Sequence, residues 1–463
     1  PSVISRFRRV GLGATLLAGL WPAVVRAQEV PVLTLRDALR EADRQAFGNR
    51  LAVATSDAEH ARARQPLKGI LPSARVEAGV IRTTDPIGAF GTTLRQRRVT
   101  QAAFDPARLN APDAITNVQG GLVVELPLLN GDAWTGWRAA RAAAGASDAA
   151  EAWESVSTRA NVVRAYYGAI LAAEKVSMLQ QAERAAQAAL RQVQAMVQQG
   201  LVTKADALQA AVRARDLEAQ RLSADNDALT ARQQLGLLLG RTLDKAPLLP
   251  LALPADSTVR QLAASDTLAG NLREYAERAD VRQAQSGQRA ADADRLRAQT
   301  TLLPRVNGFA RYDWNDPTTL VGGRPNWTVG VMASWSLFGG GSELADVAGA
   351  AARARGARVG VEALRAQARV ETETTRRLMV VALQRLDLAA QSAVQSREAW
   401  RLVEKRYAGG LATVAELLGA ESSATGAELS HAAARFAVID ALATYRRAVG
   451  ADPAELIALE TTR

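Results

Sequence analysis

Few side chains in this sequence could act as nucleophiles, general bases or metal ligands. The chain has no cysteine and only two histidines, His60 and His431, which lie far apart in predicted helical stretches. A catalytic triad or a zinc site needs such groups brought together. The glycine run at 339–341 lacks the lysine of a phosphate-binding loop. We therefore expect no enzymatic reaction, no cofactor and no metal, with both histidines on helix surfaces.

Two short segments place a threonine three residues before an acid. GLVTKAD at 200–206 reappears as GLATVAE at 410–416. This spacing predicts a capping box, in which the threonine accepts a hydrogen bond from the backbone of the acid and the acid accepts one from the backbone of the threonine. Glycine permits the preceding turn, and the leucine after it is expected to cover the turn. The residues are Gly200, Leu201, Thr203 and Asp206, and Gly410, Leu411, Thr413 and Glu416.

The first 27 residues are typical of a secretory signal peptide. A basic start precedes an apolar run from Val10 to Val25, and small residues at Val25 and Ala27 precede the expected cleavage. The apolar run is short for a spanning helix, and no stretch of about 20 apolar residues occurs elsewhere. A single N-terminal anchor is the alternative interpretation.

The net charge of +10 comes from basic residues that alternate with acids along predicted helices. A solvated helix surface has this distribution, whereas nucleic-acid binding needs a concentrated basic patch. We therefore expect no nucleic-acid partner.

The sequence repeats itself at an offset of roughly 210 residues. For example, LPLLNG at 126–131 corresponds to WSLFGG at 335–340. Three prolines between the halves indicate a linker. The predicted organisation is a signal peptide at 1–27, a first repeat at 28–240, an inter-repeat linker at 241–269, a second repeat at 270–452 and a C-terminal tail at 453–463.

Each repeat is expected to contain a shorter helix, two strands, a very long helix, a glycine turn and a returning helix. The shorter helices are predicted at about 34–69 and 270–301. No proline interrupts 128–246 or 326–452. Residues 133–199 could therefore form one helix of roughly 100 Å, at about 1.5 Å per residue. Apolar residues spaced by three and four favour long coiled-coil packing over an ordinary helix bundle.

Four segments of about ten residues alternate apolar and polar side chains, at 72–82, 119–129, 304–314 and 326–338. In the last, one side carries Trp327, Val329, Val331 and Trp335. This pattern is typical of transmembrane strands with one face in lipid and the other in a wet lumen, and tryptophan suits the membrane interface. The alternative is a soluble antiparallel sheet packed on helices.

Four strands cannot close a membrane barrel alone. An unpaired edge in lipid leaves backbone groups unsatisfied, and the smallest membrane barrels use about eight strands. We therefore expect a barrel shared between chains. A dimer would supply eight strands and a trimer twelve, and composition does not choose between them.

The order of these parts resembles the TolC family of outer-membrane export channels. The matching motifs include LTLRDALREA at 33–42, VELPLLNGD at 124–132, LLPRVNGFARY at 302–312 and RYAGGLATVAELL at 406–418. The resemblance implies a homotrimer of mixed α and β fold, with a 12-stranded outer-membrane barrel continued by a 12-helix periplasmic tunnel. It also implies cargo delivered by an inner-membrane transporter through a periplasmic adaptor protein.

The same resemblance gives the two turns a role at the tunnel entrance. Three copies of Glu416 would form an acidic ring that favours cations, although Gly419 stands where the family has a second acid. Asp206, Arg406 and Tyr407 are further candidates for the entrance. The glycines, leucines and threonines of the turns would contact the adaptor.

The alternative function is a soluble periplasmic coiled-coil scaffold or adaptor. Such a protein has no need for membrane-crossing strands with Trp327 and Val329 on one face. The long polar segment 82–118 between the first two strands is expected on the outer side of the barrel, where long loops usually lie.

Overall fold

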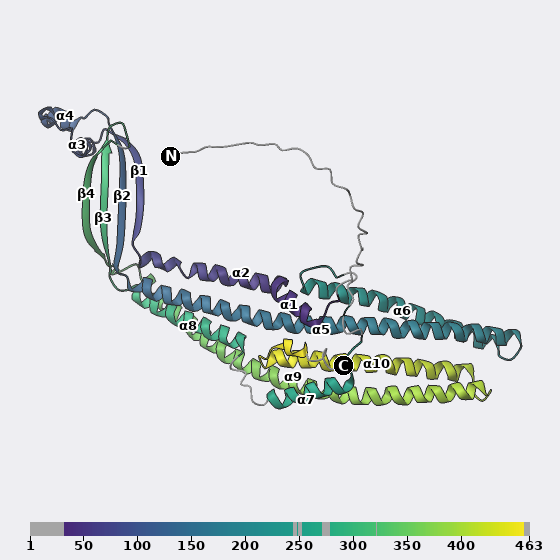
Figure 1. Cartoon of the computed structure of the whole chain (residues 1–463). Coiled ribbons are helices and arrows are strands. Elements are labelled where there is room, and N and C mark those ends of the chain that lie inside the picture. The colour runs from purple at the N-terminus through teal and green to yellow at the C-terminus, as the bar shows by residue number, and fades with distance from the viewer. Residues whose placement is uncertain (1–31, 244–247, 249–251, 271–277, 321, 458–463) are drawn as a thin grey trace, which may run out of the picture.

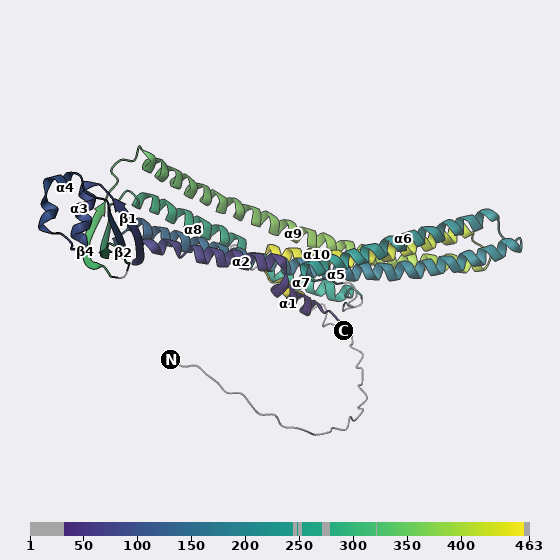
Figure 2. The same cartoon turned by 90° about the horizontal axis from the view of Figure 1, so that it is seen from above.

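A computed structural model describes residues 32–243, 248, 252–270, 278–320 and 322–457. The predicted signal peptide at 1–27 and the end of the predicted tail, 458–463, lie outside the described residues. A β-sheet stands at one end of the molecule, and a long helical body extends from it (Figures 1 and 2). The fold is therefore elongated. The sheet lies at one end, and the turns at Gly200 and Gly410, which we call the hairpin tips, lie at the other.

The sheet has four antiparallel strands in the order β1-β2-β3-β4. The strands are β1 (Ser73–Thr83), β2 (Ile115–Leu129), β3 (Arg305–Asp316) and β4 (Arg324–Ser334). Within the described chain, β1 and β4 each pair with one neighbour and leave an outer edge. The strands lie where the alternation predicted them, except that β2 begins before 119 and β4 ends before 338.

Two long helices run the length of the body, and each is followed by a returning helix. They are α5 (Gly131–Gln198), α6 (Lys204–Leu238), α9 (Ser342–Ala408) and α10 (Val414–Ala448). With 68 residues, α5 is roughly 100 Å long at about 1.5 Å per residue. This length agrees with the prediction from the proline-free sequence.

Shorter elements flank the long helices. They are α1 (Leu35–Gln45), α2 (Phe47–Arg62), η1 (Gln65–Gly69), α7 (Asp256–Gly270), α8 (Ala279–Thr300) and η4 (Pro453–Ile457). The single helix expected at 34–69 is wrong, because Ala46 has a non-helical backbone conformation, with ψ 131°, between α1 and α2. α8 begins at Ala279, whereas 271–277 lie outside the described residues.

Two segments expected to lack regular structure contain helices. The predicted linker at 241–269 includes most of α7. The segment between β1 and β2 contains α3 (Pro86–Arg95), η2 (Gln101–Phe104) and α4 (Pro106–Asn110). Asp85 caps α3 by accepting a hydrogen bond from the Gly88 N–H, and Pro86 begins the helix. These local start signals explain why a polar segment still forms helices.

The main apolar core lies midway along the long helices. Buried residues of α5, α9 and α10 meet those of α1, α7 and η4 there. α1 contributes Leu35, Ala38, Leu39 and Ala42, which share one helix face. The phenol of Tyr166, fully buried, donates to the Leu33 carbonyl oxygen at 3.0 Å. This core fixes two helical hairpins, α5–α6 and α9–α10, relative to each other.

Candidate functional sites at the sheet and the hairpin tips

The register of the sheet places the predicted apolar residues on a single face. Val76 lies opposite Leu122, Leu122 opposite Tyr312, and Tyr312 opposite Trp327. Directly opposite residues in antiparallel strands share a face. The neighbouring row is Ala74, Val124, Ala310 and Val329. We call this surface the apolar face of the sheet.

The apolar face is exposed to the surroundings in the isolated chain. The exposed fractions of Val76, Trp327 and Val331 are 75%, 74% and 67%. The soluble alternative required this face to pack on helices, which the structure contradicts. A continuous apolar surface of this kind marks contact with a membrane or a partner.

The other face of the sheet is polar. Arg75 donates to Glu77 at 3.2 Å and to Glu125 at 3.1 Å, and Arg311 pairs with Asp313 at 3.3 Å. These groups come from three strands and form a shared ion-pair network. The sheet therefore separates an apolar surface from a charged one, as the alternation predicted.

The assignment of Trp335 to the apolar strand face is wrong. β4 ends at Ser334, and the Trp335 indole N–H donates to the Leu302 carbonyl oxygen at 3.0 Å, beside the start of β3. The alternation continues in the sequence after the strand has ended. Trp335 is thus an exposed residue at the boundary between sheet and helices.

Sequence reasoning missed a buried amide chain at one end of the polar face. Gln96, which follows α3, donates to the Asn117 side-chain oxygen at 3.0 Å, and Asn117 donates to that of Asn315 at 2.8 Å. These contacts tie the helical segment between β1 and β2 to the sheet. Their only sequence signal is the pair of asparagines in otherwise alternating strands.

Both hairpin turns have the predicted local chemistry. The Thr413 N–H donates to the Glu416 carboxylate at 2.7 Å, and the Glu416 N–H donates to the Thr413 hydroxyl at 3.2 Å. Thr203 and Asp206 make the same two bonds. Both capping boxes are confirmed. The bonds from Thr413, with the nearby charge of Arg406, hold the pKa of Glu416 below its ordinary value.

The glycine turns close the helix ends with left-handed residues. Gly200 has φ +72° and Gly410 has φ +70°, a region that favours glycine. The next N–H, of Leu201 or Leu411, donates back to the Met196 or Arg406 carbonyl oxygen. The expectation that these leucines cover their turns is wrong, because their exposed fractions are 65% and 73%.

Arg406 and Tyr407 have different surroundings. The Arg406 guanidinium donates to the Leu411 carbonyl oxygen at 3.1 Å and so holds its own turn. Tyr407 is half-buried, and its hydroxyl contacts the Met196 sulfur at 3.6 Å. Burial, and then the charge of Asp206, raise the pKa of Tyr407. Tyr407 therefore joins the two hairpins, whereas Arg406 acts within one.

An apolar cluster that sequence reasoning missed joins the hairpins near their tips. It consists of Val193 on α5, Ala210 on α6, and Val414 and Leu418 on α10, with Tyr407 packed against it. Glu421 continues the same face of α10 and is 9% exposed, with one carboxylate oxygen that has no partner among the described residues. Burial raises the pKa of Glu421. Val414, Leu418 and Glu421 are spaced by four and three residues, and this spacing could have predicted that they share one helix face.

The histidines do not meet. The His60 ring contacts Asp148 at 2.7 Å, while the His431 ring contacts Asp256 at 2.9 Å. Among the described residues, no three histidine, cysteine or acidic side chains gather to hold a metal ion. Within the same part of the chain, no helix has the length and apolar character to span a membrane.

Sequence comparison identifies the family. The outer membrane efflux protein profile matches residues 87–241 and 273–451, which is more than half of the chain. The chain belongs to the outer membrane efflux protein family. It is therefore an efflux protein of the outer membrane, and the soluble scaffold gains no support. Comparison with curated protein sequences finds no match.

Solved structures support the fold of this efflux protein. A membrane protein from Pseudomonas aeruginosa has TM-score 0.74 and 21% identity, covering 90% of this chain and 92% of its own. The Campylobacter jejuni CmeC outer membrane channel has TM-score 0.74 and 17% identity, covering 90% and 85%. The open-state Neisseria gonorrhoeae MtrE outer membrane channel has TM-score 0.71 and 19% identity, covering 90% and 89%.

Proposed function

We propose that three copies of this efflux protein form one exit duct. In this assembly the sheets close a 12-stranded barrel in the outer membrane, and the long helices of both repeats continue it as a 12-helix tunnel through the periplasm. An inner-membrane transporter delivers small molecules or polypeptides through a periplasmic adaptor. The duct itself carries out no reaction and needs no cofactor.

The sheet is the observation that carries this proposal. Its apolar face is exposed, and β1 and β4 each leave an edge without a strand partner in the described chain. In lipid, an open edge would leave backbone groups without hydrogen-bond partners. Pairing β4 of one copy with β1 of the next satisfies both edges and keeps the apolar face outside.

The helical body supports the same assembly. α6 exposes Leu208, Leu222 and Leu229, and α9 exposes Leu388 and Leu402. Within each set the positions differ by multiples of seven residues, the repeat of a coiled-coil seam. Neither seam is covered in the single chain. Neighbouring copies would cover them by packing α6 of one chain against α9 of the next.

The hairpin tips are proposed as the adaptor contact and the entrance. Exposed Leu201 and Leu411 project from tips fixed by Gly200 and Gly410, with Thr203 and Thr413 capping the helices that follow. Three copies of Glu416 would line the entrance with negative charge. Asp206, Arg406 and Tyr407 would lie at the same entrance, where Tyr407 joins the two hairpins of each chain.

Replacing Glu416 with glutamine should weaken the cation preference of the reconstituted channel. The cap lowers the pKa of Glu416, so the charge persists until pH falls through that lowered value, whereas the stabilising effect is complete only above the ordinary value and declines between the two. Wild-type cation preference should therefore persist at pH 4.5, the ordinary value. Reversal potentials in a salt gradient measure this. An unchanged potential in E416Q would remove Glu416 from the entrance.

The shared barrel can be tested by cross-linking, since the chain has no cysteine of its own. Ala78→Cys on β1 is combined in turn with Trp327→Cys, Val329→Cys or Val331→Cys on β4. At least one pair should give a covalent trimer that survives boiling and disappears on reduction. Each single-cysteine variant is the matched control. Cross-links confined to single chains in every pair would contradict closure between copies.

A further inference from the structure

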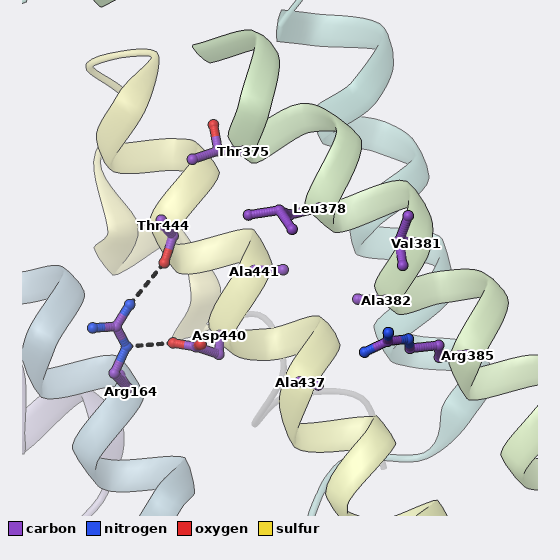
Figure 3. A pocket seen from close by; sticks show the side chains of 10 residues that line it. All are labelled: Arg164, Thr375, Leu378, Val381, Ala382, Arg385, Ala437, Asp440, Ala441 and Thr444. Atoms are coloured by element: carbon purple, nitrogen blue, oxygen red, sulfur yellow. Dashed lines mark hydrogen bonds and ion pairs between the residues drawn. The ribbon is translucent and has the colours of Figure 1, made fainter. Parts of the chain in front are cut away.

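A pocket of about 360 Å³ lies between α5, α9 and α10, beside the main core. Figure 3 shows Arg164 and Arg385 on opposite sides of it, with Ala437 and Ala441 of α10 between them. Leu378, Val381, Ala382 and Arg385 follow helical spacing on one face of α9. The pocket exists because the alanine side chains of α10 are small, and the longer side chains of α9 form its border.

The two arginines of the pocket differ in their charge partners. Arg164 forms an ion pair with Asp440 and donates to the Thr444 hydroxyl at 2.8 Å. Arg385 has no hydrogen bond or ion pair within the described part of the chain. The lining contains two arginines and one acid, so the positive charge of Arg385 is not neutralised within the pocket. Apolar side chains of α9 and α10 lie next to it.

Arg385 lies on the side of α9 that faces away from α7. Asp387, two residues after Arg385, pairs with Arg260 of α7 at 2.7 Å. Two residues correspond to about 200° around a helix, so Arg385 projects from the opposite side of α9. In a tube built from the long helices, short segments such as α7 lie outside because the inside must stay open. Arg385 then faces the lumen.

We propose that this pocket is a lumenal subsite for small organic anions that carry an apolar group. Guanidinium binds carboxylate and sulfonate oxygens in a planar, two-bond geometry, while Leu378, Val381 and Ala441 contact the apolar part. A concave wall of low polarity strengthens the field of Arg385. The subsite rests on the proposed duct and gives it a preferred class of cargo.

The test uses naphthalene-2-sulfonate as the anion and 2-naphthol as its uncharged counterpart. Binding to the purified full-length protein is measured by equilibrium dialysis, and block of channel current is measured in planar bilayers. Wild type should bind the sulfonate more tightly than the naphthol. Arg385→Gln should weaken sulfonate binding, and raise its half-blocking concentration, by roughly tenfold. Naphthol binding should change little.

Arg401→Gln is the matched control, because Arg401 lies on the same helix, is exposed and pairs with Glu398. It should leave sulfonate binding unchanged. Equal sulfonate binding by wild type and R385Q would overturn the subsite, as would loss of trimer in R385Q, which would assign the arginine to a contact between copies. Arg385-dependent binding without channel current would instead contradict the duct and keep the pocket.

Discussion

Replacing Val331 with arginine should prevent most of the protein from assembling in the outer membrane. Val331 lies on the apolar face of β4, opposite Gly308, with 67% of its surface exposed. An arginine on the lipid face costs about 2–4 kcal/mol at the middle of the bilayer. A trimer carries this cost three times. The amount of heat-sensitive oligomer in isolated outer membranes measures the effect.

Met332→Arg is the control at nearly the same depth. Met332 is the next residue, so its side chain lies on the polar face, opposite Asn307. In the shared barrel this face meets water, and M332R should assemble nearly as well as wild type. Equal loss in both variants would mean that the two faces of β4 do not differ in their surroundings. Normal assembly of V331R would exclude lipid from the apolar face.

Replacing Arg278 with alanine should give the largest loss of stability outside the sheet. Arg278 is 2% exposed, and its guanidinium pairs with Asp280 at 2.7 Å and Glu371 at 2.9 Å. It also donates to the Ala448 carbonyl oxygen and stacks 4.9 Å from the Trp153 ring centre. Its removal leaves the buried carboxylate of Asp280 without this partner, at a cost of about 3–5 kcal/mol.

Arg278 keeps its positive charge at every pH near neutrality, so the pH chosen for the unfolding experiment does not change the charge that the variant removes. Burial alone would lower the pKa of its guanidinium, but the bonds to Asp280 and Glu371 more than offset this and raise it. The midpoint of thermal unfolding at a fixed heating rate and protein concentration measures the loss. Arg358→Ala is the control, since that arginine is 51% exposed in its pair with Asp292. Its effect should stay below about 1 kcal/mol.

Local patterns in the sequence were sufficient to predict the sheet faces and the capped turns. The alternation around Val329 follows from the period of two in a strand, and register then aligned it with Ala310. The capping boxes involve residues only three positions apart, such as Thr413 and Glu416. In both cases the information and the interaction lie within a few residues of each other.

Contacts between distant segments could not be predicted in this way. Arg278 meets Glu371 across 93 residues, and Tyr407 meets Met196 across 211. The burial of Glu421 likewise depends on which helices surround it. α7 was missed for another reason: the prolines before Asp256 indicated a linker, although proline often precedes a helix that then begins normally.

The family is known, so the central claim concerns assembly: several copies share one barrel. The most direct measurement is the mass of the protein extracted from outer membranes in mild detergent, compared on gels with and without boiling. The proposed duct predicts a complex of three chains that survives without heat and separates into single chains of 49.2 kDa, or less once a signal peptide is removed, on boiling. A single chain in mild detergent, with the same mobility before and after boiling, would contradict the shared barrel.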